Sequence, residues 1–267
     1  MRLLKLSVML FLSFLLLWSG LQNTALEQVD SKSQERDDST ESSITYLRKT
    51  SESQIKKNKV DNQSDTLSYT VTKKQIDLLR GRLRNDLNDN RIDIDSVKRT
   101  FSDQLMHQLI PYWYGTPWSF GGHTSTPRKG KIACGYFVST TLKDMGLKLN
   151  RFTLAQKSPI DEAKAISCGT EIKTISDNDS NQALVAINKF VQEGIYFIGF
   201  DTGHVGFLMK QNNTLYLVHS NYLSPISVCI EPLATARVFK NFTKFHLVDI
   251  SHNEKLIRKW LNNEVLF

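Results

Sequence analysis

The sequence predicts an α+β domain built around an antiparallel sheet, and three observations lead to this fold class. The 267-residue chain is 40% hydrophobic and 23% charged, so it can bury a substantial core. Amphipathic helical patterns come first along its ordered part. From Ile195 onward the period changes to short alternating runs separated by turn residues. Helices followed by closely joined strands are typical of α+β domains.

Apolar residues recur at three- and four-residue spacing in two stretches before Pro111, which ends the second stretch. The first stripe comprises Ile76, Leu79, Leu83 and Leu87. The second, with Asp95 or Ser96 as its N-cap, comprises Val97, Phe101, Leu105 and Leu109. Further helices are expected over residues 132–145, 180–192 and 253–262.

Five strands are expected in the C-terminal half, since alternating runs are separated there by turn residues. They cover residues 195–200, 204–209, 215–220, 228–230 and 245–250. In the second strand, alternation places Val205 and Phe207 on a core face. His204 and Gly206 then lie on the opposite face, where we expect the histidine to be presented to a cleft.

The N-terminal part of the chain predicts export. Residues 1–25 carry two early basic residues and an apolar run over 6–18, which is a fair length for a signal peptide. An uncleaved N-terminal anchor is the alternative, and it would be the protein's one link to a membrane. Residues 26–70 are polar and predict a disordered tether. The folded domain is then expected over 71–267, in the periplasm, the cell envelope or outside the cell.

Positive charge gathers in one part of the chain. Residues 113–169 hold eight Lys and Arg against three Asp and Glu, within a net charge of +7 for the whole chain. This excess favours an anionic partner such as cell-wall material, but the dense basic and aromatic stripe of a nucleic-acid groove is absent. The sequence also lacks a phosphate-binding loop, paired C-x-x-C motifs and H-E-x-x-H. Nucleic-acid binding, nucleotide hydrolysis and zinc ribbons are therefore not expected.

Cys134 is the candidate nucleophile. It leads a predicted helix and follows a basic approach that contains Arg128, Lys129 and Lys131. A helix N-terminus and nearby cations both lower the pKa of a thiol, so we expect a reactive thiolate. Gly135 follows, and it leaves the approach to the sulfur open.

His204 is the candidate base, and the next strand offers it an orienting partner. A two-residue turn at Asn212-Asn213 would face His204 with Asn221 across the hairpin. A turn centred one residue earlier would face it with His219. Either partner could fix the imidazole tautomer, which gives a Cys–His–(His or Asn) arrangement.

The three cysteines leave two further alternatives open. Cys134, His204 and His219 could instead bind zinc, although the basic approach to the cysteine disfavours a metal ion. Cys168 and Cys229 could form a disulfide in an oxidising compartment or remain two buried thiols.

Four motifs, in this order along the chain, resemble the NlpC-type cell-wall cysteine peptidases. They are Gly115–Gly122, Ile132–Val138, Gly203–Leu208 and Leu217–Ser220. The resemblance implies a papain-like fold, with the nucleophile helix packed on an antiparallel sheet. It also implies cleavage of amide bonds in peptidoglycan stem peptides without a cofactor.

The same resemblance implies roles for individual residues. Cys134 would be the nucleophile, His204 the base and His219 the orienting group, with Asn221 as the alternative third member. The backbone N–H of Cys134 would stabilise the oxyanion. Substrate would be contacted by Trp118, Tyr114, Gly121 and Gly122.

This chain departs from the family pattern beside the nucleophile. Ala133 and Gly135 stand where the family has Asp and Ser, and Trp118 stands where it usually has Tyr. Two alternatives to a peptidoglycan hydrolase therefore stay open. One is a papain-like wall-binding module without turnover, and the other is a cysteine amidase or peptidase with a different substrate.

Overall fold

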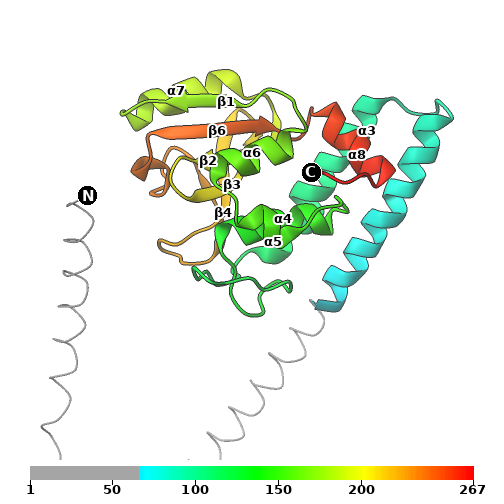
Figure 1. Cartoon of the computed structure of the whole chain (residues 1–267), viewed down its shortest axis with the longest axis horizontal. Coiled ribbons are helices and arrows are strands. Elements are labelled where there is room, and N and C mark those ends of the chain that lie inside the picture. Colours follow the sequence, from blue (N-terminus) through cyan, green and yellow to red (C-terminus); the bar gives the residue numbers. More distant parts are fainter. Residues whose placement is uncertain (1–65) are drawn as a thin grey trace, which may run out of the picture. The chain divides into compact units, whose positions relative to one another are not determined.

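The computed structural model describes residues 66–267. Its α+β architecture confirms the predicted fold class: helices pack on one antiparallel sheet of order β1-β6-β2-β3-β4-β5 (Figure 1). The predicted signal peptide or anchor, residues 1–25, and the tether up to residue 65 lie outside the described residues. Within residues 66–267, no helix combines the length and the apolar character needed to cross a bilayer.

The predicted domain boundary at residue 70 falls inside a helix. Residues 66–88 are helical, and Tyr69 is buried in the core. Its hydroxyl donates to Asp144 at 2.7 Å and accepts a hydrogen bond from the Trp113 indole at 3.0 Å. The folded domain therefore includes residues 66–70, which were assigned to the tether because residues 26–70 are polar.

Three short helical segments follow that helix. Helix α3 (Ile94–Asp103) begins at Asp93, whose carboxylate accepts a hydrogen bond from the Ser96 N–H, and not at the predicted caps Asp95 or Ser96. A π-helical segment (Gln104–Leu109) and a 3₁₀ segment (Ile110–Trp113) continue the chain. All four residues of the predicted stripe are fully buried: Val97, Phe101, Leu105 and Leu109.

The remaining helices cover the sheet and close the domain. They are α4 (Cys134–Asp144), α5 (Arg151–Ala155), α6 (Pro159–Ser167), α7 (Ser180–Phe190) and α8 (Glu254–Asn262), with a 3₁₀ turn at Phe239–Asn241. The predicted helices at 132–145, 180–192 and 253–262 are thus confirmed with small changes at their ends.

Six strands form the sheet. They are β1 (Lys173–Ser176), β2 (Gly194–Phe200), β3 (His204–Gln211), β4 (Thr214–Ser220), β5 (Val228–Pro232) and β6 (Lys244–Asp249). The five expected strands are present, and β1 is an additional edge strand beside β6. Asn212 and Asn213 both have positive φ and form the tight turn between β3 and β4.

Both faces of the sheet are buried, which corrects the expectation of a core face and an open face. Val205 and Phe207 lie in the main apolar core, as predicted, and the Phe207 ring lies 5.8 Å from the Phe137 ring of α4. Leu208 on the opposite face packs with α7 and the Phe239 turn in a second apolar cluster. His204 is only 1% exposed, because this second layer covers its side of the strand.

Candidate active site

Cys134 occupies the first turn of α4, where the helix meets the sheet. Ala133 precedes it in an extended conformation and offers no capping side chain, so the first N–H groups of the helix are left to other partners. Among the described residues, the thiol hydrogen-bonds the Gly203 carbonyl at 4.0 Å and not the His204 ring. The sulfur therefore lies against the backbone at the start of β3.

The environment of this thiol differs from the one that the sequence predicted. Burial raises the pKa of Cys134, and a charge on Glu162 would raise it further. The backbone N–H groups of Val205 and Gly135 lower the pKa, but the net shift is upward. The basic approach at 128–131 is exposed and is not among the groups that shift this pKa most. Activation of the thiol must therefore come from a base.

His204 and His219 form the hydrogen-bonded pair at the centre of the site. The Nε2 atom of His204 lies 2.8 Å from the Nδ1 atom of His219, and both rings are buried. The hairpin has the register that would face His204 with Asn221, but the β3–β4 ladder stops at Phe207↔Val218. Beyond this point the His219 ring fills the space beside His204.

Asn221 points away from His204, toward β5. Its amide donates to a Glu231 carboxylate oxygen at 3.4 Å and to the Cys229 sulfur at 3.8 Å. Its side-chain oxygen accepts the Leu223 N–H at 2.8 Å. The structure therefore brings His219, and not Asn221, to His204.

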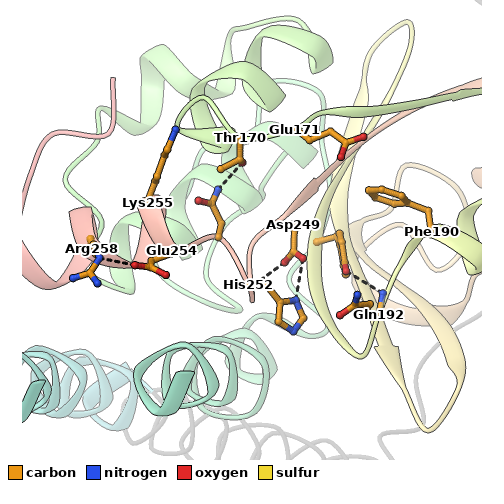
Figure 2. Close-up of a pocket in the computed structure, with 11 residues that line it drawn as sticks. Thr170, Glu171, Phe190, Gln192, Asp249, His252, Glu254, Lys255 and Arg258 are labelled. Carbon is orange, nitrogen blue, oxygen red and sulfur yellow. Dashed lines mark hydrogen bonds and ion pairs between the residues drawn. The ribbon is translucent and has the colours of Figure 1, made fainter. Parts of the chain in front are cut away.

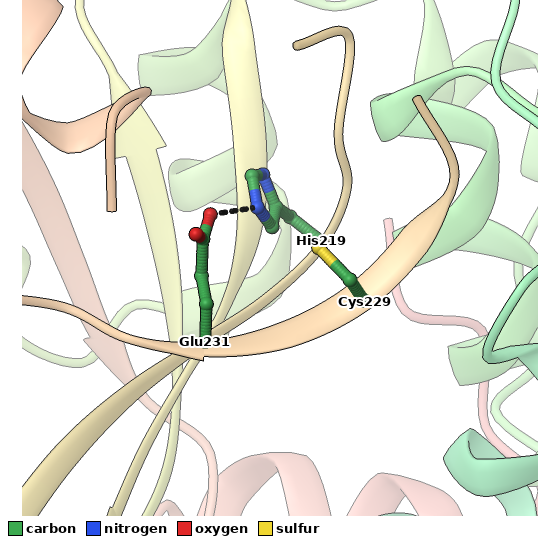
Figure 3. A group of neighbouring side chains, drawn as sticks. All are labelled: His219, Cys229 and Glu231. Atoms are coloured by element: carbon green, nitrogen blue, oxygen red, sulfur yellow. Dashed lines mark hydrogen bonds and ion pairs between the residues drawn. The ribbon is translucent and has the colours of Figure 1, made fainter. Parts of the chain in front are cut away.

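Glu231 extends the pair and was missed by the sequence reasoning. One of its carboxylate oxygens lies 2.9 Å from the Nε2 atom of His219 (Figure 3). Strand register explains the contact: His219 pairs with Cys229, and Glu231 follows two residues later on the same face of β5. The alternation of Cys229 and Glu231 was the available signal, but β5 was expected to end at residue 230.

This series of bonds fixes the tautomers of both rings. A carboxylate only accepts, so the Nε2 atom of His219 carries the proton that it donates to Glu231. Its Nδ1 atom then accepts, and the Nε2 atom of His204 donates. The Nδ1 atom of His204 is left with a lone pair, as a general base requires.

Burial also keeps the two imidazoles neutral. It holds the pKa of His204 well below its ordinary value, and the neighbouring His219 lowers it further. Burial lowers the pKa of His219 as well, although Glu231 partly offsets this effect. A neutral His204 keeps a free lone pair, but its lowered pKa also makes it a weaker base than an ordinary histidine.

Aromatic rings surround His204. The Tyr222 ring lies 5.4 Å from the His204 ring, and Trp118 lies 6.1 Å from Tyr222. Trp118 is half-buried, whereas Phe120 in the same loop is 89% exposed. Trp118 therefore approaches the base through Tyr222, a residue that the sequence reasoning did not single out.

The other three residues predicted to contact substrate differ in how deeply they are buried. Tyr114 is half-buried, and burial together with Cys229 raises its pKa to about 12. Gly121 is exposed, with open space where a Cβ would lie. Gly122 is buried, and a Cβ there would meet the Ile132 nitrogen at 2.7 Å. Gly122 is thus needed for the close approach of two backbones.

Gly135 is likewise constrained by packing. A Cβ at this position would lie 2.7 Å from the Ala155 carbonyl oxygen and 3.2 Å from a Glu162 carboxyl oxygen. Its missing side chain makes room for α5 and α6, which corrects the prediction that it opens the approach to the sulfur.

Glu162 is the second carboxyl group that the sequence reasoning missed. It lies in the first turn of α6 and is only 2% exposed. Its Oε2 atom is buried without a hydrogen-bond partner among the described residues. Burial raises its pKa well above the ordinary value, so the group is held in its neutral form beside Cys134.

Cys134, Cys168 and Cys229 are all free thiols in the structure, as in the alternative in which Cys168 and Cys229 are unpaired. Within residues 66–267, the cluster with metal-ligand geometry is His219, Cys229 and Glu231, and not the predicted zinc set. The direct 2.8 Å bond between His204 and His219 leaves no room for an ion between these rings.

Two hollows lie away from this site. One has a volume of about 620 Å³ and is bordered by Phe190, Asp249 and α8; Figure 2 shows His252 turned toward Asp249 within it. The other, of about 530 Å³, lies between α3 and the β2–β3 hairpin and also reaches His252. Neither is lined by Cys134 or His204, and their charged groups largely pair with one another.

Comparison with known proteins adds no assignment: no family model matches the chain, and no curated protein matches it significantly.

Proposed function

We propose that this protein is an exported cysteine hydrolase with a papain-like fold that cleaves amide bonds in peptidoglycan stem peptides. The observation that carries the proposal is the series His204–His219–Glu231, which begins at the strand end where the Gly203 carbonyl lies 4.0 Å from the sulfur of the helix-terminal Cys134. The four sequence motifs add the substrate class. The excess of basic residues over 113–169 agrees with an acidic polymer such as the cell wall.

In this reaction, His204 accepts the Cys134 thiol proton at Nδ1, and the sulfur attacks the carbonyl carbon of the scissile amide. In the structure the sulfur lies 4.0 Å from the Gly203 oxygen, so this mechanism requires the thiol to turn toward the His204 ring when substrate binds. In this proposal, the backbone N–H of Cys134 at the start of α4 donates to the oxyanion. His204 then protonates the leaving amine, and water releases the acyl group from the sulfur.

His219 and Glu231 contribute by orientation and charge. When His204 becomes protonated, its Nε2–H remains bonded to His219, which in turn donates to Glu231. The carboxylate stabilises the positive charge that spreads over the two rings. No cofactor takes part in these steps.

A wall-binding module without turnover is the second candidate. The raised pKa of Cys134 and its bond to Gly203 in place of His204 favour this alternative. A cysteine amidase with another substrate would share the mechanism and differ only in the substrate that it binds.

Digestion of purified peptidoglycan by the full chain tests the proposal, with released fragments identified by mass spectrometry. The matched variants are Cys134→Ala, His204→Ala and Cys168→Ala, the last removing a half-buried thiol outside the site. We expect stem-peptide fragments from the wild type and Cys168→Ala alone.

A thiol-reactive probe separates the alternatives. Fast labelling of Cys134 without wall fragments would keep the hydrolase and reject peptidoglycan as its substrate. Slow labelling that is unchanged in His204→Ala, with no fragments, would reject the hydrolase in favour of the binding module.

A further inference from the structure

Three different metal-binding side chains meet at the outer end of the site. His219 of β4 pairs across the sheet with Cys229 of β5, and Glu231 follows on the same face. One ligand atom of each lies within 4.8 Å of the others, and Figure 3 shows the three side chains turned toward one another. Strand register, and not a flexible loop, brings these groups together.

The chemistry of this cluster suits a borderline divalent ion. Imidazole nitrogen, thiolate and carboxylate are the ligands that zinc takes in proteins. A thiolate and a carboxylate together would balance the two charges of the ion. The Glu231 side chain is 25% exposed and Cys229 is half-buried, so water can occupy a fourth position.

The surroundings also support the anionic ligands. The Asn221 amide lies 3.8 Å from the Cys229 sulfur and 3.4 Å from a Glu231 oxygen, and it donates to both. Outer donors of this kind orient the ligands of metal sites. Asn221 is buried, so its amide is held in place.

We propose that His219, Cys229 and Glu231 bind a zinc ion, and that the bound ion switches off the base by reversing the tautomers of His204 and His219. The binding site stands on the three ligands alone. The switch rests on the proposed function, because it acts through the base of that reaction.

The reversal follows from proton balance. An ion on the Nε2 atom of His219 takes the lone pair at this nitrogen, so the proton of that ring moves to Nδ1. Nδ1 then donates to the Nε2 atom of His204, across the existing 2.8 Å bond. The proton of His204 must now lie on its Nδ1 atom, which can no longer accept one from Cys134. Each ring keeps one proton, and the Cys229 thiol releases its own to solvent.

Metal binding is tested first, with Co²⁺ as a spectroscopic probe on the full chain after dialysis against a chelator. The Cys134→Ala background removes the nucleophile as a competing thiolate. We expect one equivalent of Co²⁺ with a thiolate charge-transfer band, displaced by Zn²⁺. Cys229→Ser should lose the band, while Cys168→Ser keeps it. Glu231→Gln should weaken affinity more than tenfold, since changes outside the ligand shell alone cost about 10–100-fold.

The switch is tested by the rate at which iodoacetamide modifies Cys134, followed on the Cys134 peptide by mass spectrometry. One equivalent of Zn²⁺ should slow this rate more than tenfold in the wild type and leave Cys229→Ser unchanged. A thiolate band that survives Cys229→Ser would overturn the site. Stoichiometric binding with an unchanged Cys134 rate would overturn the switch. A chain that binds the metal but cleaves no wall peptide even when metal-free would reject the proposed function and leave the site standing.

Discussion

Two carboxyl groups flank the site, and their environments differ in almost every respect. Glu162 lies beside the nucleophile, is 2% exposed, and has a buried oxygen without a hydrogen-bond partner among the described residues. Glu231 lies at the far end, is 25% exposed on its side chain, and accepts hydrogen bonds from His219 and Asn221. One residue type thus serves two ends of one site under opposite conditions.

The environment of each carboxyl group, and not the residue type, therefore decides whether the group stays neutral or acts as a charged hydrogen-bond acceptor. Burial keeps Glu162 neutral, so it places no negative charge beside the thiolate that must form at Cys134. Glu231 keeps contact with water and with two donors, so it serves as the acceptor that sets the imidazole tautomers. Exchanging these environments would disable both ends.

Of the changes to the two carboxyl groups, the larger effect is expected at Glu231. In Glu231→Gln, the amide group can donate to the Nε2 atom of His219 as readily as accept from it, so the tautomers lose their bias. We expect kcat/KM on wall fragments, and the alkylation rate of Cys134, to fall about 10–100-fold. Glu171→Gln, at an exposed carboxylate, should leave both unchanged. An unchanged rate in Glu231→Gln would show that the carboxylate is only a neighbour.

The packing around the Glu162 carboxyl group is tested by Gly135→Ala. The added Cβ would lie 2.7 Å from the Ala155 oxygen and 3.2 Å from Glu162, so α5 and α6 must shift. We expect a loss of about 1–3 kcal/mol in the free energy of unfolding, measured with denaturant. Gly121→Ala is the matched control, since nothing lies within 4 Å of its added Cβ. Equal stability of the two variants would contradict the close packing.

Local patterns predicted most of the fold. The stripe from Val97 to Leu109 and the strands from β2 to β6 follow from periodicity and turn residues. Strand β1 was missed because only one of its four residues is buried, so no alternation marks it. The second buried face was missed because its cover includes irregular chain around Phe239, which has no period.

The next effect is the dependence of the free energy of unfolding on the titration of Glu162. Its folded pKa lies well above the ordinary 4.5, so the folded state keeps a proton that the unfolded chain has released. Stability therefore falls as pH rises from about 4.5 toward the raised pKa, by about 1.4 kcal/mol for each pH unit. Glu162→Gln should remove this pH dependence, so the variant should become more stable relative to the wild type as pH rises. Denaturant unfolding at successive pH values measures it, and parallel curves for the two proteins would contradict burial of a neutral acid.

The site was predictable only where its residues carry local signals. Cys134 at a helix start and His204 at a strand start stand out along the chain. Glu162 and Glu231 do not, because each acquires its role from an element distant in sequence. The choice between His219 and Asn221 depended on where the β3–β4 ladder stops, which no turn rule fixes.

The smallest effect is expected at Asn221, and it decides between the two third members. Its 3.4 Å bond to Glu231 is long and should contribute no more than an ordinary hydrogen bond, about 0.5–1.5 kcal/mol, so Asn221→Ala should lower kcat/KM about two- to twelvefold. His219→Ala removes the direct partner of the base and should cost at least about 100-fold. Kinetics of both variants on the same wall fragments make the comparison. If the two variants lose kcat/KM equally, Asn221 takes part in the catalytic series. If Asn221→Ala keeps the wild-type kcat/KM, Asn221 serves only to hold Cys229 and Glu231.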